Sequence, residues 1–181
     1  MVAHRGFTLI EIMITLAVLA FLLFLGLPSF TQWIQNTQIR TAAEGITSGL
    51  QIARNEAVRR NTSVYFAMGT GPGWTVQLAS AAPTDPPIQR RSQAEGSSTV
   101  VVTITPNTTI TVTFNGLGRI VTNADGSAPI TAINVDSSPL PFPASRKLCV
   151  TLNSSGVIQM CDTQVAATDT RACRPANPVG C

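Results

Sequence analysis

Histidine and lysine are almost absent from this chain of 181 residues, which contains one histidine, His4, and one lysine, Lys147. Without a histidine beyond the first residues, the chain lacks the side chain on which Ser-His-Asp and Cys-His catalysis and histidine-ligated metal sites depend. Charged residues make up only 12% of the sequence, and a net charge of +3 is too mild to indicate a nucleic-acid-binding protein. We therefore expect a protein that is not an enzyme and that uses no cofactor or metal.

One long hydrophobic segment dominates the N-terminal part of the sequence. It covers residues 7–27 and contains a single charged residue, Glu11. A helix of this length measures about 31 Å, enough to cross a hydrocarbon core of about 30 Å. Arg5 precedes the segment and the next basic residue is Arg40. The positive-inside rule therefore predicts a single membrane pass with the N-terminus in the cytoplasm.

This segment does not fit an ordinary secretory signal peptide. Its apolar run exceeds the usual length of about 7–15 residues, no A-x-A-like cleavage site follows it, and it contains a carboxylate. A plain membrane anchor leaves Glu11 unexplained, because an acidic residue inside a membrane helix costs about 2.5–3.5 kcal/mol on insertion scales. Cleavage after Gly6 would supply a partner, since the new α-amino group of Phe7 would lie one helical turn from Glu11 or meet it on a neighbouring subunit.

The residues around this junction resemble a known signal. Gly6-Phe7-Thr8-Leu9-Ile10-Glu11 after a short basic leader, with Gly26 and Pro28 near the end of the apolar run, is similar to the prepilin signal of type IV pilins and type II secretion pseudopilins. The resemblance implies cleavage between Gly6 and Phe7 by prepilin peptidase, N-methylation of Phe7, and polymerisation through the apolar helices. We predict that Glu11 sets the register of assembly by accepting the charge of the methylated amine of an adjoining subunit.

After Pro28 the spacing of apolar residues predicts an amphipathic helix that ends near Asn61. Gly26 and Pro28 form a predicted weak point between the two halves of the helix, because proline removes a backbone donor. The predicted apolar stripe of the second half consists of small and aliphatic residues: Ile39, Ala42, Ala43, Ile46, Leu50, Ala53 and Ala57.

Beyond residue 62, short β-branched stretches bounded by turns predict antiparallel strands, while residues 79–98 are expected to form an exposed loop. The expected strands cover residues 63–68, 74–78, 100–105, 110–114, 119–121, 131–135, 147–152 and 157–160. This pattern predicts an α+β protein with a long N-terminal helix packed on an antiparallel sheet. The resemblance implies the same arrangement, the type IV pilin fold.

We accordingly divide the chain by role. The five parts are a leader peptide (1–6), a transmembrane and filament-core helix (7–28), the amphipathic second half of the helix (29–61), a periplasmic β-sheet domain (62–161) and a C-terminal tail held by disulfides (162–181). The expected location is the bacterial inner membrane, and then the pilus at the cell surface.

All four cysteines lie within residues 149–181, at positions 149, 161, 173 and 181. An even number of cysteines beyond a membrane segment indicates disulfides in an oxidising compartment. Ser154-Ser155-Gly156 predicts a three-residue hairpin loop with a left-handed Gly156, which places Cys149 opposite Cys161 in a hydrogen-bonded, less favourable position for a bridge. We expect Cys149–Cys161 with Cys173–Cys181, and Cys161–Cys173 stays open as the alternative.

The C-terminal half resembles the GspH/FimT family of minor pilins and pseudopilins. The resemblance rests on residues 113–119 (TFNGLGR), on residues 148–152 with Gly156 and Cys161, and on residues 169–173 (DTRAC), which are similar to the end of FimT/FimU-type minor pilins. It implies a scarce subunit that helps to initiate or tip a type IV pilus together with other minor pilins and the major pilin. A type II secretion pseudopilin is the alternative function.

A DNA-binding minor pilin for natural transformation is a third candidate, because some FimT members bind DNA through a Gly-Arg-x-Arg motif. The matching residues 156–159 lack both arginines, so that site does not carry over. Solvated surface charge is the favoured interpretation of the remaining basic residues, and DNA is not a favoured partner. The residues that a weak phosphate-contacting patch would use are Arg119, Arg146, Lys147, Arg171 and Arg174.

Overall fold

A computed structural model of the chain describes residues 6–82, 84–95, 98–174 and 181. The chain divides into two compact units, residues 1–34 and residues 35–181. A single long helix, α1 (Leu9–Arg60), contributes its first half to the first unit and its second half to the second unit. All the strands belong to the second unit.

The ends of α1 follow from local chemistry. The N–H of Glu11 donates to the hydroxyl oxygen of Thr8 at 3.3 Å, so Thr8 caps the helix and Glu11 stands three residues later, the spacing of a capping box. At the other end Asn61 takes a left-handed φ of 48°, which stops the helix. The expected end near Asn61 is therefore confirmed. The helix is continuous at Gly26 and Pro28, so the weak point expected there stays a prediction.

The last turns of α1 carry a small charge cluster. The carboxylate of Glu56 accepts hydrogen bonds from the guanidinium groups of Arg59, at 2.6 Å, and Arg60, at 2.7 Å. These two hydrogen bonds lower the pKa of Glu56 to about 2.

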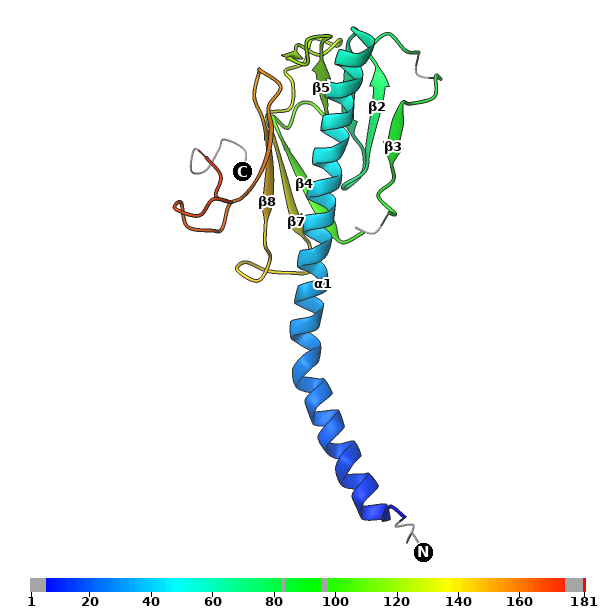
Figure 1. Ribbon diagram of the computed structural model, residues 1–181, viewed down its shortest axis with the longest axis vertical. Helices are drawn as coiled ribbons and strands as arrows, with labels where there is room; N and C mark the ends of the chain where they lie inside the picture. The colour runs from blue at the N-terminus through cyan, green and yellow to red at the C-terminus, as the bar shows by residue number, and fades with distance from the viewer. Residues whose placement is uncertain (1–5, 83, 96–97, 175–180) are drawn as a thin grey trace, which may run out of the picture. The chain divides into compact units, whose positions relative to one another are not determined.

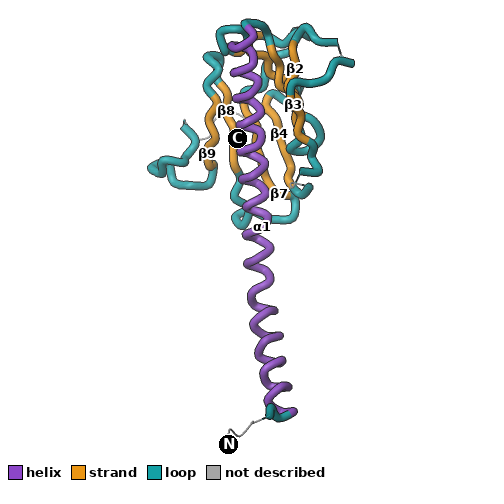
Figure 2. The backbone as a smooth tube through the Cα atoms, turned by 45° about the vertical axis from the view of Figure 1, so that its right-hand side comes forward, coloured by secondary structure: helices purple, strands orange, loops and turns teal. Residues whose placement is uncertain are grey.

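The strands form two antiparallel sheets rather than the one sheet expected (Figures 1 and 2). The five-stranded sheet has the order β3-β2-β1-β5-β6, with β1 Val64–Met68, β2 Trp74–Leu78, β3 Gln89–Arg91, β5 Thr111–Phe114 and β6 Ile120–Val121. The four-stranded sheet has the order β4-β7-β8-β9, with β4 Val100–Thr105, β7 Ala132–Ser137, β8 Leu148–Leu152 and β9 Ile158–Asp162. The short strand β3 lies in a stretch that was expected to be loop.

The second half of α1 supplies one side of the hydrophobic core of the second unit. All seven residues of the predicted stripe are at most 1% exposed, which confirms it. Small side chains on this stripe let the helix approach the strands closely. At Gly49 the approach is so close that a β-carbon would lie 2.7 Å from the Trp74 ring and 2.9 Å from the Phe66 ring.

In the described part of the second unit, three turns share one sequence pattern, N-x-x-G, and one hydrogen-bond pattern. They cover residues 115–119, 123–127 and 153–157. In each turn the N–H of the first residue donates to the carbonyl oxygen of the fifth, and the N–H of the glycine donates to the carbonyl oxygen of the asparagine. The glycines Gly118, Gly126 and Gly156 have φ values of 71°, 81° and 83°, which require a residue tolerant of the left-handed region. The predicted left-handed Gly156 is confirmed.

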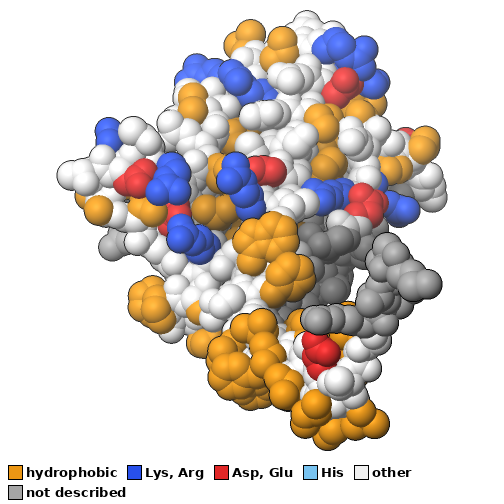
Figure 3. All heavy atoms as spheres, turned by 60° about the horizontal axis from the view of Figure 1, so that its bottom comes forward, with side chains coloured by type: hydrophobic (Ala, Val, Ile, Leu, Met, Phe, Trp, Pro, Cys, Tyr) orange, Lys and Arg blue, Asp and Glu red, His pale blue; other side chains and the backbone are white. Residues whose placement is uncertain are grey.

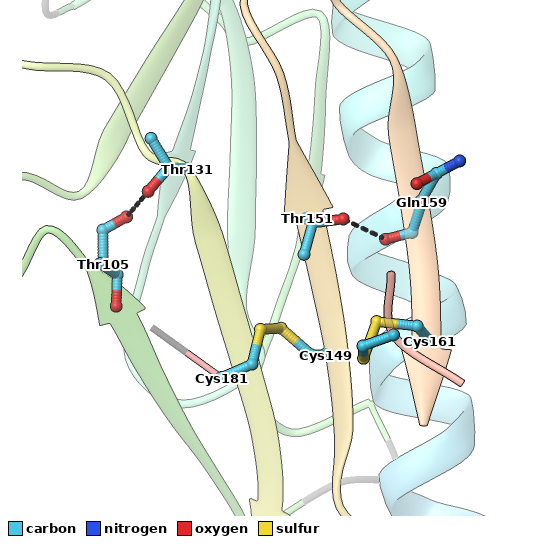
Figure 4. The surroundings of a disulfide bond; sticks show 8 residues. Thr105, Thr131, Cys149, Thr151, Gln159, Cys161 and Cys181 are labelled. Carbon is cyan, nitrogen blue, oxygen red and sulfur yellow. Dashed lines mark hydrogen bonds between the residues drawn. A yellow bond between two sulfur atoms is a disulfide. The ribbon is translucent and has the colours of Figure 1, made fainter. Parts of the chain in front are cut away.

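The disulfide pairing expected from the hairpin is wrong. Cys149 does stand opposite Cys161 in the β8–β9 register, as predicted. However, Cys149 is bonded to Cys181, with their Cα atoms 5.9 Å apart, and Cys161 to Cys173, at 4.8 Å (Figure 4). The Cys161–Cys173 disulfide, which the sequence left open as the alternative, is present in the structure.

The path of the tail explains this pairing. The N–H of Asp162 donates to the carbonyl oxygen of Arg171 at 2.8 Å, and the N–H of Cys173 donates to that of Asp162 at 3.3 Å. The tail therefore runs alongside the end of β9 and brings Cys173 next to Cys161. A direct bridge across the hairpin would have used the wider, hydrogen-bonded position.

Candidate functional site: the apolar helix and a basic groove

The first unit presents an unshielded apolar helix. Between residues 7 and 27 each large hydrophobic side chain is 46–80% exposed. By length and composition α1 contains a stretch that could span a membrane. Figure 3, which brings the N-terminal end of the helix toward the viewer, shows hydrophobic side chains covering it. Such a surface is stable only when lipid or other apolar helices surround it.

The predicted cleavage junction precedes this helix. Gly6 and Phe7 lie outside α1, which begins at Leu9, and Phe7 is 80% exposed. A β-carbon on Gly6 would meet no atom of the described residues within 4 Å. The carboxylate of Glu11 forms no ion pair with any residue that the structure describes. A cation from outside the described chain would therefore find this carboxylate unpaired.

The second unit contains a groove of about 420 Å³ with a basic rim. Three arginines, Arg40, Arg146 and Arg171, line it together with Leu148, Met160 and the acidic residue Asp162. On the face shown in Figure 3, Lys and Arg side chains stand with hydrophobic side chains between them.

Specific hydrogen bonds position the walls of this groove. The side-chain amide of Asn36 donates to the carbonyl oxygen of Ala144 at 3.1 Å, and its oxygen accepts from the N–H of Arg146 at 2.7 Å. Helix α1 therefore holds the segment before β8 in place. On the opposite wall, Arg171 is held by the backbone bond between Asp162 and the tail.

Carboxylates already neutralise two of the three arginines. Arg171 donates to Asp169 at 2.8 and 3.1 Å, and this contact lowers the pKa of Asp169 to about 2. Arg40 donates to Glu44 at 2.8 Å. Arg146 forms no ion pair with any described residue. The groove therefore has little uncompensated positive charge with which to hold a polyanion.

The structure brings together part of the basic set expected from the sequence. Arg146 and Arg171 line the groove, and Arg174 lines an adjoining hollow that also includes Arg171. Lys147 is half-buried, and Arg119 belongs to the turn at residues 115–119. Arg40 was not among the basic residues expected from the sequence. Its position on the polar face of the predicted helix was the signal that could have indicated it. A role of these residues in binding DNA stays a prediction.

These features define a class of protein. A largely apolar N-terminal helix that continues into a half packed on antiparallel sheets, with a disulfide-held tail, is the architecture of type IV pilin-like subunits. Two family models agree with this class: residues 1–27 match the prokaryotic N-terminal methylation motif, and residues 42–156 match the type II transport protein GspH. Since the second match covers more than half of the chain, the chain belongs to the GspH/FimT family of type IV pilin-like proteins. This family consists of structural pilin and pseudopilin subunits rather than enzymes.

Two solved structures are similar to this chain. The type IV minor pilin FimU of Pseudomonas aeruginosa is 18% identical with a TM-score of 0.51, and the match covers 71% of this chain and 91% of FimU. GspH of E. coli is 17% identical with a TM-score of 0.42, and the match covers 76% of this chain and 94% of GspH. At this identity the FimU match establishes the fold alone. A search of curated proteins gives no significant match.

Proposed function

We propose that this protein is a minor pilin, a low-abundance subunit that helps to initiate or tip a type IV pilus. Prepilin peptidase removes residues 1–6, and Phe7 becomes the N-methylated first residue of the mature chain. The mature subunit resides in the bacterial inner membrane with its second unit in the periplasm. It then joins other minor pilins and the major pilin in the filament.

The exposed helix of residues 7–27 is the observation that carries this proposal. Moving such a helix from lipid into water would cost about 1.5–3 kcal/mol for each large apolar side chain. The helix therefore leaves the bilayer only where the apolar helices of other subunits replace the lipid. A filament with a helical core provides such an environment.

Glu11 gives this assembly a register. Within the apolar surroundings an unpaired carboxylate is costly, and the charged amine of Phe7 on an adjoining subunit relieves that cost. Because the pairing forms only at one axial offset between two helices, the interaction favours one arrangement of neighbours.

A type II secretion pseudopilin is the second candidate, and the match of residues 42–156 to the GspH model favours it. The two candidates differ in location, since a pilus is sheared from the cell surface whereas a pseudopilus remains in the periplasm.

Mass spectrometry of sheared surface filaments and of the remaining membranes tests the proposal. We expect a peptide that begins with N-methylated Phe7 in the sheared fraction. The same processed peptide confined to the membranes would favour the pseudopilin. A chain that still begins at Met1 in both fractions would refute prepilin processing and the proposal with it.

A further inference from the structure

We propose that the turns at residues 115–119 and 153–157 form a docking surface for a neighbouring pilin-type subunit. We call this surface the turn patch and define it by Val58, Leu117 and Val157. The partner surface is apolar and has carboxylates at its border. This inference rests on the proposed function, because it concerns the contacts of the subunit within an assembly.

The turn patch has a closely fitted base. A β-carbon on Gly118 would lie 3.1 Å from a methyl carbon of Val58, and one on Gly156 would collide with the carbonyl oxygen of Gly118. The N–H of Ile120 donates to the carbonyl oxygen of Ser154 at 3.2 Å, which joins the two turns directly. Two chain segments far apart in the sequence therefore meet at the end of α1.

Hydrogen bonds also order each turn internally. The side-chain oxygen of Asn115 accepts from the N–H groups of Leu117, at 3.0 Å, and Arg119, at 3.1 Å. The side-chain oxygen of Asn153 accepts from the N–H of Val157 at 3.0 Å. A surface held in this way loses little conformational freedom when it binds.

On this ordered base the side chains are apolar and open to solvent. Leu117 is 78% exposed, Val58 51% and Val157 43%. The patch therefore combines exposed apolar area with preorganised backbone, which is the combination found at protein-binding surfaces.

The other N-x-x-G turns show that Leu117 is not needed to form its turn. Leu117 occupies the third position of the pattern, and the same position holds Asp125 in one of the other turns and Ser155 in the second. Turn positions of this kind usually carry polar residues. All three turns nevertheless have the same hydrogen bonds and the same left-handed glycine. The fold therefore does not require a leucine at this position, and its exposed side chain is available for a contact.

The charges at the border specify the partner. Arg54 lies beside Gly118 and Gly156, and Arg119 follows Gly118 in the first turn. Neither forms an ion pair with any residue in the described part of the chain. The Nε of Arg54 donates to the carbonyl oxygen of Gly118 at 3.2 Å, which holds this guanidinium group beside the patch. A complementary surface places carboxylates opposite these two groups and apolar side chains opposite Leu117.

Photo-cross-linking in cells that produce the full chain tests this inference. Benzoylphenylalanine replaces Leu117 in one strain and Phe142 in a control strain, because Phe142 is equally apolar and 80% exposed but lies in a different loop. We expect position 117 to form adducts with chains that begin with an N-methylated residue, and position 142 to form at least tenfold fewer. Adducts of position 117 with proteins that lack a pilin N-terminus, or equal yields at both positions, would overturn the proposal.

Substitutions supply a second measurement. In chains without benzoylphenylalanine, Leu117→Asp should lower the yield of subunit that formaldehyde cross-links to other pilin-type chains, in membranes and filaments together, by at least tenfold. Leu117→Met and Phe142→Asp should leave that yield within about twofold. A wild-type yield for Leu117→Asp would refute the docking surface. If Leu117→Asp fails to fold, the comparison of positions 117 and 142 still decides the question.

The N-terminal peptide of the wild-type chain, measured in the same samples, distinguishes a failure of the proposed function from a failure of the turn patch. An unprocessed wild-type N-terminus contradicts the proposed function. A processed N-terminus with no effect at Leu117 contradicts the turn patch alone.

Discussion

Replacing Gly49 by alanine tests how closely α1 packs on the five-stranded sheet. A β-carbon at this position would lie 2.7 and 2.8 Å from two ring carbons of Trp74 and 2.9 Å from a ring carbon of Phe66. Both rings are buried, at 4% and 0% exposure, and they pack on each other with centroids 5.8 Å apart. Neither ring therefore has open space into which it can retreat.

The expected loss of stability follows from these distances. Carbon atoms pack best at about 3.5–4.0 Å, so the helix and the rings must separate by roughly 0.8 Å. Overpacking of this kind costs about 1–3 kcal/mol, and the better helix propensity of alanine returns about 1 kcal/mol. We expect Gly49→Ala to lower the free energy of unfolding of the second unit by about 1 kcal/mol. At about 2–4 °C per kcal/mol, Tm falls by a few degrees.

Gly45→Ala is the matched control on the same helix. The β-carbon there would meet the guanidinium group of Arg91, whose long side chain can turn away toward solvent. That movement gives up two long hydrogen bonds, of 3.4 Å to the carbonyl oxygen of Thr41 and 3.5 Å to that of Glu95, and a loose ion pair of 4.0 Å with the Glu95 carboxylate. The gain in helix propensity then offsets the loss, and stability should stay equal or rise.

Thermal unfolding of the full chain in detergent micelles, followed by near-UV circular dichroism, measures both variants. The buried rings of Trp74 and Phe66 contribute to this signal. A Tm for Gly49→Ala at or above that of Gly45→Ala would refute the reasoning from the distances.

Three further predictions concern assembly, acid stability and the disulfides. Glu11→Gln keeps the capping-box spacing but removes the charge, so it should impair incorporation into filaments as strongly as Glu11→Val while leaving leader cleavage intact; incorporation restored by glutamine would show that Glu11 acts only as a helix cap. The pKa of Glu56 is about 2 in the folded chain, below its ordinary value of 4.5, so its contribution to stability is complete above about pH 4.5 and is lost as the pH falls toward 2. Glu56→Gln should therefore flatten the acid limb of the plot of Tm against pH, and an unchanged limb would contradict this. Digestion with trypsin and with cyanogen bromide, which cuts after Met160, should leave one disulfide-linked species of three peptides under non-reducing conditions, whereas Cys149–Cys161 pairing would leave two separate species. The three peptides are residues 148–160, 161–171 and 172–181.

Local patterns predicted most of the fold, because the signals of the helix and of most strands lie within short windows. The apolar stripe from Ile39 to Ala57 recurs at helical spacing, and its burial followed from that spacing alone. Strand β3 was not predicted because Gln-Arg-Arg has no β-branched residue. Pairing with β2, rather than intrinsic preference, makes it a strand. The division into two sheets was not predicted either, because it depends on long-range pairing: β5 pairs with β1 across more than forty residues of chain.

The disulfides show the same limit. The hairpin register, which depends on the turn at Gly156, was predictable, and it placed Cys149 opposite Cys161. The pairing depends instead on where the tail runs, and the hydrogen bonds between Asp162 and the tail decide that. No periodicity in residues 162–181 indicates such a path.

The two candidate functional surfaces differ in the same way. The N-terminal signal can be recognised in the sequence because the residues expected to act in it, Gly6, Phe7 and Glu11, lie within six consecutive positions. The turn patch can be recognised only from the structure, which shows that residues 115–119 and 153–157 are in contact. Its sequence trace is nevertheless present: among the three N-x-x-G turns that the structure describes, one carries leucine where the others carry aspartate and serine, and a fourth match to the pattern, residues 177–180, lies outside the described residues. A residue that departs from its own internal repeats without a structural reason points to a contact outside the chain. For this subunit, Leu117 is that residue.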